Sequence, residues 1–425
     1  MASIVTSKFR IHNAQQFYES FSEAANTIMY LFVGKNTAFA NDNSPPTPIN
    51  STANIEYTPW RDMYGVKRIQ SADVTHAVPR YDWTSGTVYV AYDDTSTSLL
   101  TDTFYVMTED YNVYKCLFNN ASAASTTKPT GTSSARFTTA DGYIWKFMYT
   151  VSTAKALKFL TSDYMPIQTL ASDDGTTQWS VQSAAVDGGI EVIKVTSGGS
   201  GYATAPSVTI IGDGTGATAN ATITANVVTA VTITAAGTGY TKASVSFASG
   251  AAAATAIISP RYGHGADPIE ELGAKYIMIN VRLDGSESNT ISTANEFRQV
   301  GIVRDPYLFG TTTRASASSY RQTFKYQLSG ISGTFSLDEP VSSGSNTSNV
   351  VEWDTPNLYV IKPINQNFAN GATITGATST ATGTIAAITT PGLQPYTGDI
   401  LYVENRVPIS RAADQIEDVK LIIQF

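Results

Sequence analysis

The sequence predicts a mainly β protein, built from sandwich-like domains nested by insertion, with a few helices that include one near the N-terminus. Charged residues form only 15% of the 425-residue chain, whereas aromatic residues reach 11% and include 23 tyrosines. Tyrosine and threonine favour the pleated, half-buried surface of a sheet. Short apolar runs also recur at close spacing, with Ser-, Thr- and Gly-rich linkers between them, which is typical of all-β folds. The length predicts two or three domains.

The N-terminal portion predicts one helix followed by one buried strand. Asn13 and Gln16 fit a capping box at the start of the helix. Apolar residues then follow at helical spacing: Phe17, Phe21, Ala24, Ala25 and Ile28. The apolar run "IMYLFVG", which ends at Gly34, predicts the strand. The Pro- and Asn-rich portion after it predicts an exposed loop.

Four further strands are predicted between residues 74 and 150. Their sequences are "TVYVAY" (87–92), "TFYVMT" (103–108), "NVYKCLF" (112–118) and "GYIWKFMYTV" (142–151). The single cysteine, Cys116, lies in the third of these strands. We interpret it as a buried structural thiol, because free cysteine packs as a small apolar residue. One cysteine also excludes an intramolecular disulfide and a cysteine-based zinc site.

Residues 188–260 predict a β insertion built from two repeats. Charge nearly vanishes there, and "IKVTSGGSGYATAPSVTI" is followed by the similar "VTITAAGTGYTKASVSF". Each copy predicts an alternating strand, a Gly-x-Gly-Tyr corner at Tyr202 or Tyr240, and a second alternating strand. The pattern therefore indicates repetitive β architecture.

The same insertion contains Gly212-x-Gly214-x-Gly216, which resembles a phosphate-binding loop. Such a loop requires a helix that begins at the last glycine, and the residues that follow alternate with period two instead. Glycine at β corners, where positive φ or close packing is needed, is the better interpretation. Asp213 resembles an acidic corner of calcium-binding repeats, but one aspartate supplies too few oxygen ligands.

A second low-charge stretch, 368–392, predicts a small Gly/Thr-rich β insert. The remaining residues, 1–187 with 261–367 and 393–425, predict a mainly β core of two or more nested subdomains. The final residues alternate with period two, with Val419, Leu421, Ile423 and Phe425 on one face. They predict a strand that docks into a sheet.

Charge and hydropathy exclude several classes of partner. The chain carries 27 basic and 35 acidic residues, a net charge of −8, and no basic run. An electrostatic grip on nucleic acid is therefore not expected. No segment approaches the roughly 18 apolar residues that a membrane span requires, and the N-terminus lacks the pattern of a signal peptide. We expect synthesis in a cytosol and no membrane insertion.

No constellation of residues predicts catalysis. His12, His76 and His264 lie far apart, and only His264, in "GHGADP", has a context that a metal ligand or a base would suit. A tight loop that approaches another strand or chain is the preferred interpretation. Motifs for zinc hydrolases, serine hydrolases and EF-hands are missing from the sequence. The sequence therefore predicts no enzyme, no cofactor and no metal site.

Six segments together resemble the baseplate wedge protein, the product of gene eight, of T4-like contractile-tailed bacteriophages. They are "IVTSKFR" with "NAQQFYESF" (4–21), "VPRYDW" (78–83), "VYKCLF" (113–118), "DGYIWKFMY" (141–149), "EFRQVGIVRDP" (296–306) and "GDILYVENRVPISRAADQIEDVKLIIQF" (398–425). The resemblance implies a mainly β structural subunit of the virion tail baseplate, without catalysis, that forms homodimers and binds other wedge proteins. The inserts 188–260 and 368–392 depart from the family pattern.

Tyrosine and arginine in these segments are candidates for contact between subunits, because both residue types are enriched at interface hot spots. The residues selected are Arg80, Tyr81, Arg298, Tyr402, Glu404 and Arg406. The alternative is that the tyrosines are ordinary sheet residues and that the arginines pair with carboxylates of their own chain.

The resemblance implies one function, and the repeats suggest an alternative. The first is a wedge subunit of the baseplate, assembled in the host bacterial cytoplasm, that joins neighbouring wedge proteins and moves as a rigid body during baseplate rearrangement and tail contraction. The alternative is a tail-associated adhesin or glycan-binding module that uses the Gly/Thr-rich β repeats.

Overall fold

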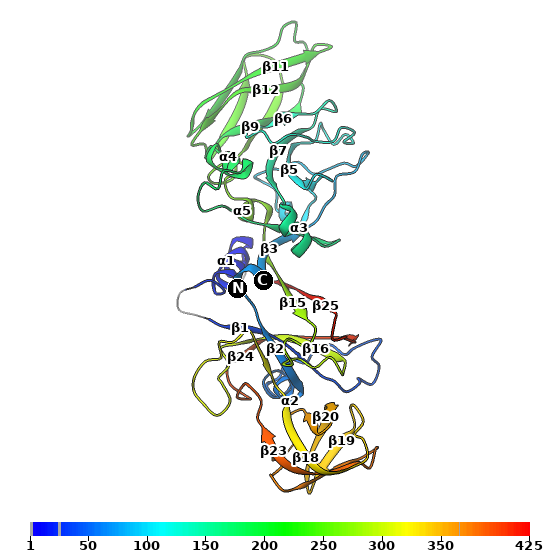
Figure 1. The fold of residues 1–425 in the computed structure, drawn as a ribbon. Coiled ribbons are helices and arrows are strands. Elements are labelled where there is room, and N and C mark those ends of the chain that lie inside the picture. The colour runs from blue at the N-terminus through cyan, green and yellow to red at the C-terminus, as the bar shows by residue number, and fades with distance from the viewer. Residues whose placement is uncertain (1–2, 24–26, 365) are drawn as a thin grey trace. The chain divides into compact units, whose positions relative to one another are not determined.

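The computed structural model describes residues 3–23, 27–364 and 366–425. Strands dominate it, and α-helices are few and short, so the predicted mainly β class with a helix near the N-terminus is confirmed (Figure 1). The chain divides into two compact units. Unit 1 comprises Met1–Gln16, Thr75–Met278 and Ile422–Phe425, and unit 2 comprises Phe17–Val74 and Ile279–Leu421.

Unit 1 contains most of the helices and the repeats. Its elements are the first part of α1 (Ser7–Glu19), β3 (Val74–Pro79), β4 (Tyr105–Met107), β5 (Asn112–Phe118), β6 (Phe137–Thr138), β7 (Ile144–Thr150), α3 (Thr153–Phe159), β8 (Tyr164–Ile167), α4 (Thr177–Ser183), β9 (Ile190–Ser197), β10 (Val208–Gly212), β11 (Thr215–Thr224), β12 (Val227–Thr238), β13 (Ala243–Phe247), β14 (Ala253–Ile258) and α5 (Pro268–Leu272). The chain passes from one unit to the other within β15 (Tyr276–Asp284) and β25 (Ile416–Gln424).

Helix α1 begins earlier than the sequence predicts. It starts at Ser7, where the Thr6 hydroxyl accepts a hydrogen bond from Phe9 N at 3.3 Å. Asn13, the predicted cap, therefore lies inside the helix, so that prediction is wrong. Thr6, about two turns upstream of Asn13, already accepts from a free amide of the first turn, because a threonine hydroxyl can also act as an N-cap. The helix ends at Glu19, so Phe17 is the part of the predicted apolar face that lies within it, and the prediction is wrong for Phe21 and Ile28. Ala24 and Ala25 lie outside the described residues.

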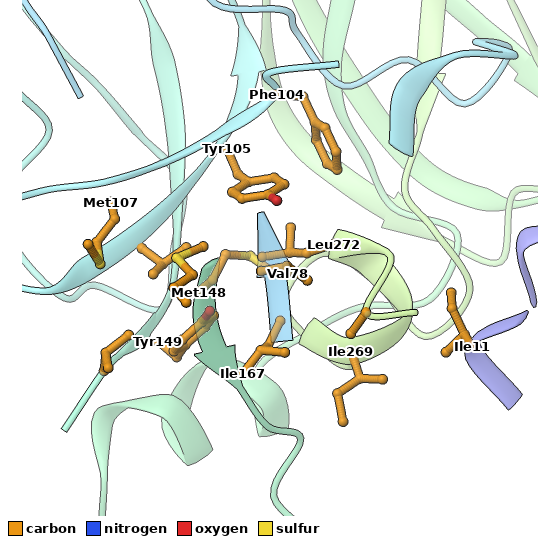
Figure 2. Close-up of a cluster of buried hydrophobic side chains, with 14 residues drawn as sticks. Ile11, Val78, Phe104, Tyr105, Met107, Met148, Tyr149, Ile167, Ile269 and Leu272 are labelled. Carbon is orange, nitrogen blue, oxygen red and sulfur yellow. The ribbon is translucent and has the colours of Figure 1, made fainter. Parts of the chain in front are cut away.

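The core of unit 1 surrounds a four-stranded sheet of order β4-β5-β7-β6. One face of this sheet packs on side chains from α1, β3 and α5, including Ile11, Val78 and Ile269 (Figure 2). The other face carries Cys116 and Trp145, both fully buried. Because both faces are covered, the middle of β5 and of β7 is buried at every position.

The predicted strand 87–92 is not a strand. Thr87 makes only an isolated bridge to Ser125, and Val90 N and Tyr92 N donate to separate carbonyls, those of Thr103 and Cys116. Tyr89 and Tyr92 are nevertheless buried. The alternation of aromatic residues therefore reflects their burial in the core and not pairing with a neighbouring strand. The sequence pattern is the same in both cases, so it does not distinguish them.

The two repeats form a pair of interlocked copies, drawn in green in Figure 1. The first copy supplies β9, β10 and β11, and the second supplies β12, β13 and β14. β9 pairs with β14, β10 with β13, and β11 with β12, all antiparallel. Each strand thus pairs with a strand of the other copy. The pairing is unchanged when the two copies are exchanged, as it would be about a two-fold axis. The copies share one core, which includes Ile193, Ile233 and Tyr240.

The repeat corners have the conformation that the sequence predicts. Gly199 and Gly201 in one copy, and Gly237 and Gly239 in the other, have φ between 62° and 80°. The corner tyrosines cross to the other copy, where Tyr202 Oη accepts from Ala252 N and Tyr240 Oη from Ala217 N. A side chain on Gly214 would lie 2.5 Å from the Tyr240 ring. The Gly-x-Gly-x-Gly run therefore accommodates a tyrosine at the corner between β10 and β11, and no helix follows it.

Unit 2 combines a sheet with a barrel. Its elements are β1 (Met29–Gly34), a π-helical turn η1 (Ala53–Tyr57), α2 (Thr58–Asp62), β2 (Met63–Arg68), β16 (Phe297–Arg304), β17 (Ser319–Arg321), β18 (Phe324–Ser332), β19 (Pro340–Ser343), β20 (Asn346–Asp354), β21 (Asn357–Val360), β22 (Thr373–Gly376), β23 (Thr382–Thr389) and β24 (Asp399–Ile409). The sheet order is β17-β2-β1-β16-β24, and the barrel closes in the order β18-β21-β20-β19-β22-β23.

The predicted buried strand that ends at Gly34 is β1, buried at every position and in the middle of the sheet. The stretch 368–392 contains β22 and β23, which are two of the six barrel strands. Its apolar residues Phe368, Ile374 and Ile385 belong to the barrel core. The alternation near the C-terminus is confirmed in β25, where Val419 and Leu421 are buried.

Candidate contact surfaces

Strand β24 forms one edge of the unit 2 sheet and carries three of the six predicted contact residues. Its pairing with β16 shifts register twice, once beside Arg298 and once beside Leu401. Side chains near both shifts face solvent, with Leu401 41% exposed and Val407 51% exposed. Register shifts and a proline such as Pro408 are usual protections of an edge strand against indiscriminate pairing. The surface of β24 is thus open but irregular.

Glu404 connects two other half-buried side chains of β24, those of Tyr402 and Arg406. Tyr402 Oη donates to one carboxylate oxygen at 2.7 Å, and Arg406 donates to both oxygens at 2.8 and 3.2 Å. Arg406 also donates to the carbonyl of Lys420 at 2.9 Å. Burial and the hydrogen bond to Glu404 raise the pKa of Tyr402, so its hydroxyl stays a donor. The three predicted residues therefore form one preorganised polar cluster.

Arg298 lies on β16, the neighbouring strand, and is only 6% exposed. Its guanidinium donates to Asp42 at 2.9 Å, to Glu296 at 2.8 Å and to the carbonyl of Asn36. A buried guanidinium with three acceptors within the chain has few donors left for a partner. Arg298 therefore fastens the loop that follows β1 onto the sheet.

Arg80 and Tyr81 lie in unit 1, directly after β3. Arg80 makes a bidentate pair with Asp82 at 2.8 and 2.9 Å and donates to the carbonyl of Thr161. Tyr81 packs its ring against Tyr105, with 5.2 Å between the ring centroids. The three predicted arginines each pair with a carboxylate of their own chain, and for Arg406 that carboxylate is Glu404. The alternative interpretation expects such pairs. Contact with another subunit stays a prediction.

Sequence reasoning missed Leu401 and Val407, the exposed apolar residues of the edge strand. A signal for them exists, because Pro408 within an otherwise regular strand pattern indicates an edge or a bulge. What the pattern did not reveal is which sheet the strand joins, since that depends on pairing with residues about one hundred positions away.

Unit 1 contains a buried ionic cluster that the sequence did not indicate. Lys115 Nζ donates to Glu271 at 2.6 Å, and the two side chains are 0% and 2% exposed. The other oxygen of Glu271 accepts from Gly265 N at 2.7 Å. His264 Nδ1 lies 4.0 Å from Glu271, and its ring packs edge-on against Tyr92. Burial, with the charges of two lysines nearby, holds the pKa of His264 well below its ordinary value, so the ring is neutral.

The loop around His264 confirms the preferred interpretation of "GHGADP". Gly263 has φ of 99°, and a side chain there would lie 2.4 Å from the backbone of Val186. Gly265 has φ of 92° and closely approaches Val181. The glycines are therefore required because the loop packs tightly against α4 and the residues that follow it.

Two other residues considered for chemistry have structural roles. Cys116 is buried, and burial raises the pKa of its thiol, so it stays protonated and unreactive. Asp213 accepts hydrogen bonds from Thr241 N at 2.9 Å and Lys242 N at 3.1 Å. Asp213 thus joins one repeat to the corner of the other.

Within residues 3–23, 27–364 and 366–425, no group of three or more His, Cys, Asp or Glu side chains is placed to hold a metal ion. The helices of the same residues are all too short or too polar to cross a bilayer.

Comparison with known proteins finds a family match in the N-terminal part of the chain. Residues 3–121 match the family described as Bacteriophage T4, Gp8. The chain is also 25% identical over 206 residues to the baseplate wedge protein gp8 of Enterobacteria phage T4. That similarity covers 39% of this chain and 60% of the T4 protein, which is less than two thirds of the relative. The predicted resemblance to the gene-eight baseplate wedge family is confirmed, and the family segment runs from α1 through β5.

Proposed function

We propose that this chain is a structural subunit of a phage tail baseplate that joins neighbouring wedge proteins and has no catalytic activity of its own. The match of residues 3–121 to the gene-eight family is the observation that carries the proposal. Synthesis and assembly take place in the cytoplasm of the host bacterium. The subunit forms a homodimer and moves as a rigid body when the baseplate rearranges and the tail contracts.

The open edge of the unit 2 sheet supports a role in joining subunits. The cluster of Tyr402, Glu404 and Arg406 is fixed by its own hydrogen bonds before any partner arrives. Preorganised side chains lose little conformational entropy on association, which favours affinity. Leu401 and Val407 add exposed apolar area on the same edge strand. Among the predicted contact residues, Arg80 and Tyr81 offer a second surface, on unit 1.

Purified particles of the phage that encodes this chain provide the test of the proposal. Mass spectrometry is expected to detect the chain in tails, and gold-labelled antibodies against it are expected to mark the end of the tail. Detection of the chain only in infected-cell lysate, or labelling confined to fibres, would overturn the proposal.

Substitutions on β24 test whether this strand contacts other subunits, separately from whether the chain lies in the baseplate. Leu401→Asp places a charge on the edge strand without removing a hydrogen bond, and it is expected to reduce incorporation into particles when supplied by complementation. Leu157→Asp is the matched control, because Leu157 is 80% exposed on α3. Normal incorporation of Leu401→Asp and of Arg406→Ala together would exclude the β24 surface and leave the baseplate location intact.

Rigid-body movement has its own test. Amide exchange in the buried strands β5 and β7 is expected to be equal in resting and contracted tails, because a rigid body repacks only at its interfaces. Loss of protection in these strands on contraction would show that the chain itself rearranges.

The adhesin alternative receives less support from the repeats. Tyr202 and Tyr240, the aromatic residues at the repeat corners, are 3% and 5% exposed and hydrogen-bonded to the opposite copy. They are therefore structural and offer no aromatic surface to a glycan.

A further inference from the structure

Unit 2 contains a cavity of about 450 Å³ that none of the surfaces above uses. Its walls carry three aromatic rings, from Phe309, Phe324 and Tyr396, and three side-chain amides, from Gln366, Asn367 and Gln394. Small-molecule sites occupy roughly 300–1,000 Å³ and combine aromatic walls with a few polar groups. The other cavity described in unit 1 measures about 30 Å³, which suits a single water molecule.

Tyr396 stands at the mouth of this cavity and is held there. Its ring is 47% exposed, packs at 5.4 Å against the ring of Tyr57, and lies 5.4 Å from the ammonium of Lys362. Its backbone has φ of 65°, the left-handed region in which glycine is the ordinary residue. A large side chain in this conformation costs about 1–2 kcal/mol. A large ring thus occupies a position where the backbone favours glycine.

The polar groups of the cavity are amides and one ammonium. Gln394 Oε1 accepts from Gly310 N at 3.0 Å, which fixes the orientation of that amide. Side-chain amides offer both donors and acceptors, and so pair well with neighbouring hydroxyl groups. The lining residues include no Asp, Glu, His or Cys. The cavity therefore has no carboxylate, imidazole or thiol, and its chemistry suits binding without turnover.

We propose that this cavity binds an oligosaccharide, with a preference for one that carries a carboxylate. The face of Tyr396 stacks on the C–H face of a pyranose ring, the amides bind its hydroxyl groups, and Lys362 pairs with the acid. A nucleic acid is disfavoured by the net charge of −8. An apolar peptide segment would leave the three amides unpaired, which is costly when they are desolvated. The proposal is independent of the wedge function, because it concerns a different surface.

The test is a titration of the full chain with three defined probes: tetragalacturonate, which is acidic, and maltotetraose and chitotetraose, which are neutral. Calorimetry is expected to detect binding, tightest for tetragalacturonate. Tyr396→Gly is expected to weaken that binding about tenfold or more, since it removes the stacking ring. The same variant is expected to melt no lower than the parent, since glycine relieves the backbone conformation.

The matched control is Tyr262→Gly. Tyr262 is 54% exposed, has φ of 71° and carries Arg261 over its ring at 4.7 Å, but it lines neither described cavity. Its substitution is expected to leave the affinity unchanged. Failure of all three probes to bind at millimolar concentration, or equal affinity of Tyr396→Gly and the parent, would overturn the proposal. Loss of particle assembly in Tyr396→Gly without sugar binding would overturn it too, and would assign the cavity to a neighbouring protein.

Discussion

At the scale of single residues, Asp141 shows how one carboxylate orders a long loop. It lies before β7, in "DGYIWKFMY", and accepts from Thr126 N at 2.7 Å and Thr127 N at 2.9 Å. The hydroxyl of Thr139 donates to its other oxygen. Partial burial alone would raise its pKa, but these bonds outweigh burial and lower the pKa from 3.8 to about 2.

Asp141→Asn is expected to destabilise the protein by about 1–2 kcal/mol at neutral pH, because the amide is a weaker acceptor than the partly exposed carboxylate. A lowered pKa contributes stability that is complete above pH of about 4 and is lost as the pH falls toward about 2. The difference in melting temperature between parent and variant should therefore shrink across that window. Asp110→Asn, on an exposed turn, is the control. A difference that persists at pH 2 would contradict the assignment.

The buried pair of Lys115 and Glu271 makes a second prediction at this scale. Glu271→Gln leaves the ammonium of Lys115 buried without its counter-ion and is expected to cost about 3–5 kcal/mol. Combining it with Lys115→Met removes both charges and is expected to recover much of that loss. Chemical denaturation followed by tryptophan fluorescence checks this, because Trp145 lies in the same unit. Simple additivity of the two substitutions would show that the charges do not act as a pair.

At the scale of elements, the interlocked repeats predict that equivalent glycines respond alike. A side chain on Gly199 would lie 2.6 Å from Ala252 N, and one on Gly237 would lie 2.5 Å from Ala217 N. Gly201 and Gly239 have equally positive φ but nothing within 4 Å.

Alanine at Gly199 or Gly237 is therefore expected to cost more than about 3 kcal/mol, because backbone must move in addition to the strain of positive φ. Alanine at Gly201 or Gly239 is expected to cost only about 1–2 kcal/mol. Thermal unfolding of the four variants measures this. The prediction is contradicted if the loss of stability differs as much between Gly199 and Gly237, or between Gly201 and Gly239, as it does between these two pairs. Equivalent positions in the two copies would then not contribute equally to stability.

The insertion itself is expected to be removable. β9 and β14 pair at its base, with Val195 opposite Ala254, so a two-residue Asn-Gly turn can replace residues 196–253. Val192 and Ile257, which pack with Tyr92 and Leu117, remain. The shortened chain is expected to fold and to melt within a few degrees of the parent. Loss of near-ultraviolet circular dichroism would instead show that the repeats stabilise the remainder.

Elements with strict periodicity and local boundaries were predictable from the sequence. β5 was predicted at its observed bounds, and the repeat corners followed from Gly-x-Gly-Tyr alone. The segment 87–92 was not, because its alternation reflects burial of Tyr89 and Tyr92 without a partner strand. Tyr402, Glu404 and Arg406 were each selected from the sequence, but their position at the edge of a sheet was not predicted. That position depends on pairing between distant segments of the chain, which periodicity does not encode.

At the scale of the whole molecule, the proposed homodimer gives a mass of about 91 kDa in solution, twice that of the 45.4 kDa chain. Light scattering at several concentrations measures it. A constant dimer mass supports the proposed homodimer, and Leu401→Asp shows whether the β24 edge is its interface. A monomer at all concentrations would contradict the homodimer, and a trimer would favour the adhesin alternative.

The division of the chain between its two units has a consequence for synthesis on the ribosome. Unit 2 needs Phe17–Val74 from the beginning of translation and Ile279–Leu421 from its late stage, and unit 1 waits for Ile422–Phe425. Ile422 packs against Ala77, Phe159 and Met278, all of which are translated long before it. Neither unit can be completed until the last segment of the chain has been translated. The early strands therefore have unpaired edges and exposed apolar side chains during synthesis, and chaperones are expected to protect them from aggregation.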